Sequence, residues 1–394
     1  MPQTESQLKS WQKMKFKDFA NTSPSIKLER GKEYPFIPME VLDGQHKFPL
    51  EVRRKSFSGG GAKFANGDTI FARITPCLEN GKIAVVKGLE EGIGFGSTEF
   101  FVFRGKEGVS DSDFVYYLSR TDTIRDPAVK SMVGASGRQR ADKTVVDNVQ
   151  IVAPDLPQQK QIADVLSTYD DLIENNTKRI KILEEMAQAI YKEWFVFFRF
   201  PGHEKVKMID SKTEFSKIPK GWKVEKLGDK INILRGKNIT KNTIVPGKVP
   251  VIAGGMGPAY FHNKANVEGP AITVSASGAN SGYIKLYHED IWASDCSYIN
   301  KNSTPFVYYY FLLLKNRQVE VTGLQRGSAQ PHVYPKDLAR LLIVDPPEEL
   351  THYFEKKAES TFSMINNFQL QNQNLRQARD LLLPKLVGGE IAVK

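Results

Sequence analysis

Two turns of this sequence combine side chains that can read the edges of nucleic-acid bases. One runs from Ser136 to Arg140 and the other from Arg326 to Gln330, and both contain glycine. Arginine can donate two hydrogen bonds to guanine and glutamine can bridge adenine, while glycine allows a close backbone approach. We therefore predict base contacts in these turns; the alternative is a pair of solvated charged turns. The predicted contacts are Ser136, Arg138, Gln139, Arg140, Arg326, Ser328 and Gln330.

Two further groups of residues are candidates for DNA contacts, and the second of them is predicted to bind phosphates, which Lys and Arg contact. The first group recurs at corresponding places in the two halves of the chain, and the second is a single run. For each group the alternative is again a solvated charged turn. The first group is Arg30, Lys32, Arg235, Lys237 and Asn238, and the second is Arg53, Arg54 and Lys55.

The overall charge favours a polyanionic partner. The chain of 394 residues has 55 Lys and Arg against 45 Asp and Glu, a formal net charge of +10. The excess is concentrated between residues 201 and 250, where twelve basic residues face five acidic ones. Excess positive charge attracts nucleic acid. Many proteins are mildly basic without binding it, so the charge alone decides little.

The sequence contains no recognisable catalytic centre. It has no GxxxxGK[ST] phosphate-binding loop and no GxGxxG fingerprint after a predicted strand. Its six histidines are scattered without the spacing of a metal site. Cys77 and Cys296 are expected to be free, buried thiols. We therefore expect a chain that binds no cofactor or metal and is not an enzyme by itself.

The second half of the chain repeats the first at an offset of roughly 190 to 210 residues, the kind of internal repeat that reveals an architecture. Arg30-Gly31-Lys32 is echoed by Arg235-Gly236-Lys237, and Phe114 to Tyr117 recurs as Phe306 to Tyr309. In the same comparison, the turn from Ala135 to Gln139 aligns with the turn from Arg326 to Gln330. The matches keep their order along the chain, which favours two similar domains over chance similarity of short strings.

Each repeat is followed by a heptad pattern that predicts a long helix. The first helix is predicted over residues 158–200, roughly 60 Å at about 1.5 Å per residue. The second starts at 348, is interrupted in its apolar seam by Arg379, and is predicted to end at Pro384. The predicted seam residues are Ile162, Leu166, Tyr169, Ile173, Asn176, Ile180, Leu183, Ile190, Phe354, Ile365, Phe368, Asn372, Leu375 and Leu382.

The two seams bury each other most simply by packing within the chain as an antiparallel coiled coil, because both helices are already tethered. The alternative is that each helix pairs with another protein. With short strands broken by Gly, Asn and Pro between the helices, we predict an α+β fold of two similar globular domains separated by two long helices. The predicted boundaries are 1–157 and 218–347 for the domains, 158–200 and 348–394 for the helices with the tail, and 201–217 for a linker.

Three strings now carry a resemblance to a known family. The first, Leu156 to Leu166, looks like a Pro-x-x-x-Gln-x-x-Ile-Ala-x-x-Leu helix start. The second is Leu172 to Asn176 followed by Leu183-Glu184 and Trp194-Phe195, and the third, Arg379 to Ile391 (RDLLLPKLVGGEI), is close to a family C-terminus. Ile218 to Trp222 (IPKGW) with Leu227-Gly228 also matches the usual opening of a recognition domain. The chain resembles the specificity subunit of type I restriction-modification systems. The resemblance covers essentially the whole chain, although Ser10-Trp11-Gln12 replaces Pro-x-Gly-Trp at the start of the first repeat.

The resemblance implies a non-catalytic DNA-recognition subunit. Residues 1–157 and 218–347 would be target-recognition domains, each reading one half of a bipartite, gapped site in double-stranded DNA. The helices would set the spacing and dock methyltransferase subunits, two in number, with restriction subunits joining through the complex. S-adenosylmethionine, ATP and Mg²⁺ would be bound by those partners, and the complex would act in the cytoplasm. The polar N-terminus and the lack of an apolar stretch of about 18 residues agree with no membrane contact.

Two other classes of function remain open from the residues alone. A nuclease would need acidic metal ligands held together, and Asp68, Glu79 and Glu99 lie near predicted strands without being grouped by spacing. A two-domain RNA-binding or scaffold protein would also use basic domains on helices, although no RNP or KH motif is present. The bases read and the spacer length do not follow from the sequence.

Overall fold

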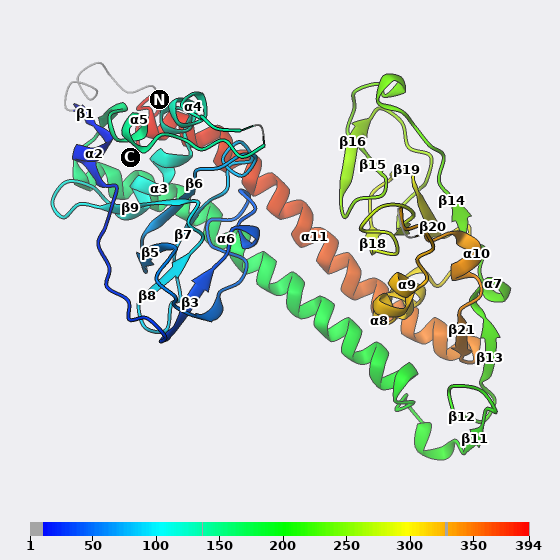
Figure 1. Ribbon diagram of the computed structural model, residues 1–394. Helices are drawn as coiled ribbons and strands as arrows, with labels where there is room; N and C mark the ends of the chain where they lie inside the picture. The colour runs from blue at the N-terminus through cyan, green and yellow to red at the C-terminus, as the bar shows by residue number, and fades with distance from the viewer. Residues whose placement is uncertain (1–10, 136, 328–329, 394) are drawn as a thin grey trace. The chain divides into compact units, whose positions relative to one another are not determined.

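The computed structural model describes residues 11–135, 137–327 and 330–393 (Figure 1). The chain divides into two compact units. Unit 1 comprises Met1–Lys178 and Gln369–Lys394, and unit 2 comprises Arg179–Phe368. Each of the two long helices, α6 (Leu156–Tyr191) and α11 (Glu348–Val387), contributes one part to unit 1 and the other part to unit 2. The predicted seam residues are therefore divided between the two units.

The described residues of unit 1 form three sheets. Their strand orders are β1–β10, β2–β9–β6–β7 and β4–β3–β8–β5. In the third sheet, β3 runs parallel to β8 and antiparallel to the edge strand β4. The strands are β1 (Gln12–Lys15), β2 (Ala20–Asn21), β3 (Glu33–Ile37), β4 (Arg53–Ser56), β5 (Ala62–Ala65), β6 (Thr69–Ala72), β7 (Ile83–Val85), β8 (Ile93–Gly96), β9 (Phe100–Gly105) and β10 (Gln150–Ala153).

Unit 2 repeats this topology. The orders β13–β21, β14–β20–β17–β18 and β16–β15–β19 correspond in turn to the three sheets of unit 1, except that the third sheet has no strand equivalent to β5 among the described residues. Strand β15 is again parallel to one neighbour and antiparallel to the edge strand. The two similar domains predicted from the repeat are thus confirmed. The strands are β13 (Lys223–Lys226), β14 (Leu234–Arg235), β15 (Val249–Ile252), β16 (Pro258–His262), β17 (Ala271–Ser275), β18 (Ile284–Tyr287), β19 (Trp292–Ala293), β20 (Cys296–Asn300) and β21 (Leu342–Asp345).

The segment 201–217, predicted as a linker, carries an extra strand. Its strand β11 (Met208–Asp210) pairs antiparallel with β12 (Lys217–Pro219). All three residues of β11 are exposed, so the strand shows no alternation of apolar and polar residues. A small two-stranded ribbon of this kind is stabilised mainly by backbone hydrogen bonds, which leave no trace in a hydrophobic pattern.

Short helices cover the sheets in each unit. The Phe-Val-Tyr-Tyr strings of the repeat lie in α3 (Ser112–Arg120) of unit 1 and at the start of α8 (Val307–Asn316) of unit 2, and their side chains belong to the cores. The remaining helices are α2 (Phe16–Phe19), α4 (Asp122–Lys130), α5 (Lys143–Asp147), α7 (Leu227–Lys230), α9 (Gln318–Gly323) and α10 (Pro335–Leu338).

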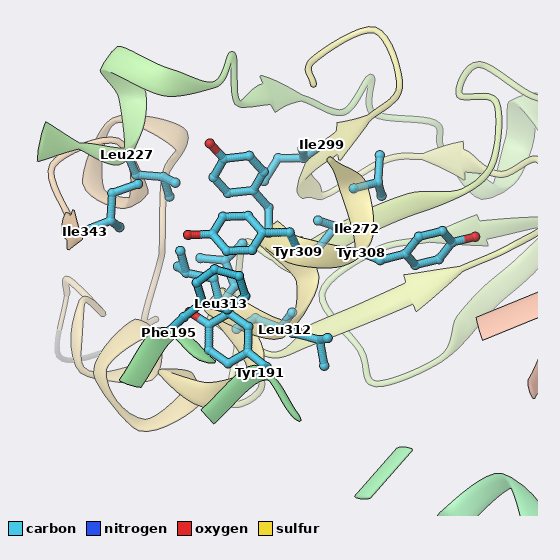
Figure 2. Close-up of a cluster of buried hydrophobic side chains, with 14 of the residues drawn as sticks. Tyr191, Phe195, Leu227, Ile272, Ile299, Tyr308, Tyr309, Leu312, Leu313 and Ile343 are labelled. Atoms are coloured by element: carbon cyan, nitrogen blue, oxygen red, sulfur yellow. The ribbon is translucent and has the colours of Figure 1, made fainter. Parts of the chain in front are cut away.

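Aromatic side chains join the helix pair of unit 2 to its globular core. Figure 2 shows Tyr191, the last residue of α6, and Phe195 beside Tyr309 of α8. The ring of Phe195 lies 5.0 Å from that of Tyr309 and 5.0 Å from that of Phe354 on α11. Such edge-to-face contacts add to the free energy gained from burying the rings. The globular part and both helices of unit 2 therefore share one core.

The first long helix is shorter than predicted and starts two residues earlier. It begins at Leu156, where the carboxylate of Asp155 accepts a hydrogen bond from the backbone N of Gln158 at 3.0 Å, and Pro157 is tolerated in the first turn because its missing N–H would have no partner there. The α-helix ends at Tyr191, and Lys192–Val196 form a π-helical turn. Its 36 residues span about 54 Å.

The two helices pack antiparallel in each unit. In unit 1, Asn176 donates to Gln371 at 3.3 Å, and Asp170, earlier in α6, forms an ion pair with Arg379, later in α11. In unit 2, Arg179 lies over the ring of Phe368. Residues that come later in α6 thus face residues that come earlier in α11. The predicted α+β class with an antiparallel helix pair is confirmed.

The predicted seam residues differ in burial. Seven are buried, and one, Ile190, is 38% exposed while its neighbour Tyr191 is buried. A straight α-helix drifts by about 20° per heptad relative to a strict seven-residue repeat, so after four heptads the next residue takes the inward position. The buried residues are Ile162, Leu166, Ile173, Asn176, Phe354, Ile365 and Asn372, and the half-buried ones are Tyr169, Ile180, Leu183, Phe368, Leu375 and Leu382.

Two predictions about the end of α11 are wrong. Arg379 does not interrupt the seam: it is 1% exposed and turns inward to the equally buried Asp170. Pro384 does not end the helix, which continues to Val387. A proline removes one donor of the backbone ladder, and here its carbonyl still accepts a hydrogen bond from Gly388 at 2.8 Å. Burial of Leu383, Leu386 and Val387 in the core of unit 1 stabilises this last turn.

Candidate nucleic-acid interface

The two glycine-containing turns lie at equivalent places in the two units. In unit 1, a bridge between Val133 and Arg140 closes the turn, and in unit 2, a bridge between Arg326 and His332 does so. Each turn is bound to the equivalent neighbouring segment of its own unit. Thr75 N donates to Gln139 O at 3.0 Å in unit 1, and Gly278 N donates to Pro331 O at 3.1 Å in unit 2. Backbone hydrogen bonds thus define a common frame for the two turns.

This frame corrects the register of the repeat. The bridges align Val133 with Arg326 and Arg140 with His332, whereas the sequence comparison set Ala135 against Arg326. The sequence comparison is displaced by two residues at the start of the turn and by one at its end. The second turn is one residue shorter, and short strings of Gly, Ser, Ala and Gln can be matched in several ways. Ser136 and Ser328, both predicted base contacts, lie outside the residues that the structure describes.

In each unit an acidic residue directly before an equivalent strand binds an arginine, and in unit 1 that arginine belongs to the turn. In unit 1, Arg140 Nη2 donates to Glu99 at 2.7 Å and Nε donates at 3.0 Å, while Arg73 Nε lies 3.4 Å from the same carboxylate. The hydrogen bonds from Arg140 lower the pKa of Glu99. In unit 2, Asp295 occupies the corresponding place before β20 and accepts from Arg235 at 2.9 Å. Ser277 Oγ donates to the other oxygen of Asp295.

Three of the predicted DNA-contacting arginines are therefore already engaged. Arg140 binds Glu99, Arg235 binds Asp295, and Arg326 lies 2.8 Å from Asp337, which is 1% exposed. A guanidinium held by a carboxylate has less freedom to reach DNA, and the DNA contacts of these arginines stay predictions. Arg140 and Arg326 belong to the turns, whereas Arg235 lies on β14, and the sequence alone could not identify their distant acidic partners.

The tips of the turns keep their exposure. Arg138 and Gln330 are exposed, and Gln139 is half-buried. Arg138 makes no ion pair with a carboxylate in the part of the chain that the structure describes. Arginine and glutamine at an open turn have the donors that base edges accept. Within the described turns, these three side chains are the best-placed candidates for base contacts.

The run Arg53-Arg54-Lys55 forms most of the edge strand β4, whose four residues are all exposed. Arg53 lies 2.9 Å from Glu40 and 3.1 Å from Glu51, and Arg54 lies 2.8 Å from Glu90. Lys55 lies over the ring of Phe36 at 4.7 Å. Exposed ion pairs of this kind contribute little to stability, so a phosphate can compete for these cations.

The other predicted pair of basic groups is exposed in both units. Arg30, Lys32, Lys237 and Asn238 all have exposed side chains. Lys32 lies 3.6 Å from Glu91. The backbone of Lys237 is fixed on both sides: its N donates to Ala293 O at 2.9 Å, and its O accepts from Trp292 Nε1 at 2.9 Å. Its side chain is thereby held at the surface of unit 2.

A buried polar network in unit 1 was missed by sequence reasoning. The carboxylate of Asp170 accepts from Tyr117 Oη at 2.6 Å in addition to its pairing with Arg379. Nearby, Lys47, which is 5% exposed, donates to Ser167 Oγ at 2.9 Å. The network joins the globular part of unit 1 to both helices. Asp170 directly follows Tyr169 of the predicted heptad seam. An acidic residue beside an apolar seam was the only indication of this network in the sequence.

The acidic residues that were considered for a nuclease do not come together as a metal site in residues 11–135, 137–327 and 330–393. No group of three or more His, Cys, Asp or Glu there could hold a metal ion. Of the acidic residues considered for a nuclease, Asp68 is bound by Arg104 at 2.6 Å and Glu99 by Arg140. Among the same residues, every helix is too short or too polar to cross a membrane.

The chain thus consists of two α+β domains of similar topology, and each domain presents an equivalent turn at its surface. A model of the type I restriction modification DNA specificity domain matches the chain twice, at residues 9–185 and 219–375. The chain therefore belongs to the family of type I restriction-modification specificity subunits, and it has two DNA-recognition domains. Such subunits recognise DNA and leave catalysis to other subunits, so the chain is a recognition subunit and not an enzyme by itself.

Individual relatives are similar along nearly the whole chain. The specificity subunit of type I restriction enzyme MjaIX from Methanocaldococcus jannaschii is 27% identical over 430 residues, which cover 98% of this chain and 94% of the relative. The HindI specificity subunit of Haemophilus influenzae is 23% identical, covering 82% and 86%. The crystal structure of a type I S subunit from M. genitalium has the same fold, with a TM-score of 0.58, 17% identity and 96% coverage of both chains.

Proposed function

We propose that each unit reads one half of a bipartite, gapped site in double-stranded DNA. The observation that carries this proposal is the common frame of the two turns. Each turn is held by an arginine–carboxylate pair, Arg140 with Glu99 and Arg326 with Asp337, and each presents different side chains at its tip. One design with two different tips suits an asymmetric site whose halves have different sequences. Direct readout in the major groove needs such differences, because each base pair presents its own pattern of donors and acceptors.

The remaining parts of the proposal concern the complex. The paired helices set the distance between the two half-sites and dock methyltransferase subunits, two per chain, and restriction subunits join through that complex. S-adenosylmethionine, ATP and Mg²⁺ are bound by these partners and not by this chain. The complex works in the cytoplasm. Exposed apolar residues on the helices, such as Leu172, Ile182, Met186 and Leu370, are available for contacts with partner subunits.

The test is to co-express the full chain with a cognate methyltransferase subunit and to map methylated adenines across the host genome by single-molecule sequencing. The expected result is one gapped motif, methylated in both halves. Exchange of residues 216–345 for the corresponding segment of another specificity subunit should change one half of the motif and leave the other half unchanged. A change in both halves would contradict the assignment of one half to each unit.

Two other outcomes would contradict other parts of the proposal. If the subunits do not associate, the docking role of the helices is wrong. If they associate and no sequence-specific methylation appears, the reading of DNA by this chain is wrong, and the purified chain should then be assayed with Mg²⁺ for nuclease activity and for RNA binding.

A further inference from the structure

The edge strand β16 of unit 2 exposes large apolar side chains on both of its faces. Tyr260 is 43% exposed and Phe261 is 55% exposed, and in the preceding turn Met256 is 59% exposed. Strand β16 lies beside β15 (Figure 1). Because neighbouring residues of a strand point to opposite faces, the rings of Tyr260 and Phe261 project from opposite sides of this pair of strands. Neither ring is part of a hydrophobic core. Exposed aromatic rings on both faces of a strand therefore indicate a surface that binds a ligand.

The sheet register places these rings where unit 1 has its basic run. Pro250 of β15 pairs with Phe261, and Pro35 of β3 pairs with Arg54. The parallel neighbours also agree, since Val251 is opposite Trp292 and Phe36 is opposite Phe95. Tyr260 and Phe261 therefore occupy the positions of Arg53 and Arg54. The same edge carries guanidinium groups in one unit and aromatic rings in the other.

The charge around β16 favours a polyanion as the occupant. Between residues 230 and 267 the sequence has no Asp or Glu and six Lys or Arg. Four of these, Lys237, Lys241, Lys248 and Lys264, are exposed. None of the four forms an ion pair with a carboxylate in the described part of the chain. Four exposed lysines without an acidic partner suit DNA, which carries one negative charge per about 1.7 Å of helix axis, better than they suit a methyltransferase or another protein of mixed surface charge.

We propose that β16 is a DNA-reading strand, in which Tyr260 and Phe261 contact the methyl groups of thymine bases while the surrounding lysines bind phosphates. At Phe261, β16 and β15 form a two-stranded ribbon, because β15 pairs with β19 only at Val251 and Ile252. A two-stranded β-ribbon fits the major groove, and the thymine methyl group is the apolar feature exposed there. The inference rests on the proposed function and deepens it, because it names residues that determine the half-site read by unit 2. In unit 1, Arg53 and Arg54 of β4 hold the equivalent positions.

The test uses the full chain in complex with its methyltransferase and a duplex that contains the motif found by methylome sequencing. Each thymine of the unit 2 half-site is replaced in turn by deoxyuridine, which lacks the methyl group. At one thymine or more, the wild-type complex should lose roughly tenfold in affinity, the order expected for one base contact. Phe261→Ala or Tyr260→Ala should cause a comparable loss on the unmodified duplex and remove the sensitivity to deoxyuridine.

Val319→Ala is the matched control, because Val319 is 87% exposed in unit 2 and lies on α9 away from this strand. It should leave DNA affinity unchanged, and Phe261→Leu should retain part of it. Equal binding of all duplexes by wild type and Phe261→Ala would overturn the inference while leaving the proposed function intact. Loss of the methyltransferase from the Phe261→Ala complex would also overturn it, by showing a protein contact. If the wild type recognises no motif, the proposed function itself fails.

Discussion

The two units build the same frame and complete it with different chemistry. Unit 1 places a buried ion pair, Asp170–Arg379, between its helices, whereas unit 2 places the aromatic rings of Tyr191 and Phe354 there. On the edge strands, β4 of unit 1 carries arginines paired with glutamates, and β16 of unit 2 carries exposed aromatic rings among unpaired lysines. Backbone pairing therefore preserves the frame, while the side chains at equivalent positions are free to diverge.

The largest expected effect concerns the contacts between α6 and α11, which are ionic in unit 1 and aromatic in unit 2. Asp170→Ala leaves Arg379 buried without its main partner, and breaking a buried pair from one side typically costs about 3–5 kcal/mol. Thermal unfolding and hydrogen exchange of residues 369–387 should both report the loss. The double change Asp170→Leu with Arg379→Met should recover most of the stability, because well-packed apolar residues often replace a buried pair without loss. A single variant as stable as wild type would contradict this role of the pair.

A pH effect should appear in unit 2. Burial raises the pKa of Glu355 from 4.5 to about 7, although backbone hydrogen bonds from Tyr308 and Tyr309 favour its charged form. Since the folded pKa is the higher one, the folded state binds more protons between these values. Stability should therefore fall as pH rises from about 4.5 to about 7, by on the order of 3 kcal/mol at most.

The measurement is urea unfolding followed by tryptophan fluorescence, because three of the four tryptophans lie in unit 2. Glu355→Gln should flatten the dependence in this pH window. In unit 1, the uncharged Gln159 accepts from the backbone N of Asp111 at the start of α3, so Gln159→Ala should leave the pH dependence unchanged. An equal slope in wild type and Glu355→Gln would show that another group titrates.

The carboxylate that holds the turn of unit 1 predicts a smaller effect on sequence discrimination. Glu99→Gln should weaken the hold on Arg140 and loosen this turn, which lowers the discrimination against substituted bases in the half-site read by unit 1 by roughly tenfold, equivalent to about 1.4 kcal/mol. Glu99 is a positioning residue, so Glu99→Asp should restore part of the preference at an unchanged melting temperature. The half-site read by unit 2 is the internal control. Equal losses at both half-sites would indicate a general structural defect.

The smallest expected effect sharpens the comparison of the two edge strands. Arg54 already lies 2.8 Å from Glu90, so a phosphate gains only the difference between two exposed partners. Arg54→Ala should weaken DNA binding by about threefold or less and reduce the slope of log affinity against log salt by about one. Phe261→Ala should lose more affinity and leave the slope unchanged. If Phe261→Ala reduced the salt slope and Arg54→Ala left it unchanged, the assignment of phosphate contacts to β4 and base contacts to β16 would be wrong.

The fold was largely predictable because it rests on repeated patterns. The heptads predicted both long helices, and the ordered matches of Arg-Gly-Lys and Phe-Val-Tyr-Tyr predicted two similar domains. Errors arose where one residue decides the outcome. A strict seven-residue period placed Ile190 inward, and the twist of a real α-helix turned Tyr191 inward in its place.

The surface was less predictable than the fold. Arginine in a turn looks the same in sequence whether it meets solvent or, as Arg140 does, a carboxylate 41 residues away. The exposed rings of β16 were missed for the opposite reason, because Tyr260 and Phe261 next to each other are typical of a buried strand. Only the pairing of β16 at the edge of its sheet reveals that they lie in solvent. Side-chain partners and sheet edges depend on long-range contacts that local patterns do not contain.

The buried pair of unit 1 also sets an order for synthesis on the ribosome. Asp170 and Arg379 are separated by 209 residues, and at about 5–20 residues per second the second partner emerges at least about 10 s after the first. All of unit 2 lies between them in the chain. Throughout that interval the nascent chain carries an uncompensated acidic side chain on an apolar helix face. Unit 2 can complete its core before unit 1, and a premature stop before Arg379 would leave unit 1 open for recognition by chaperones and proteases.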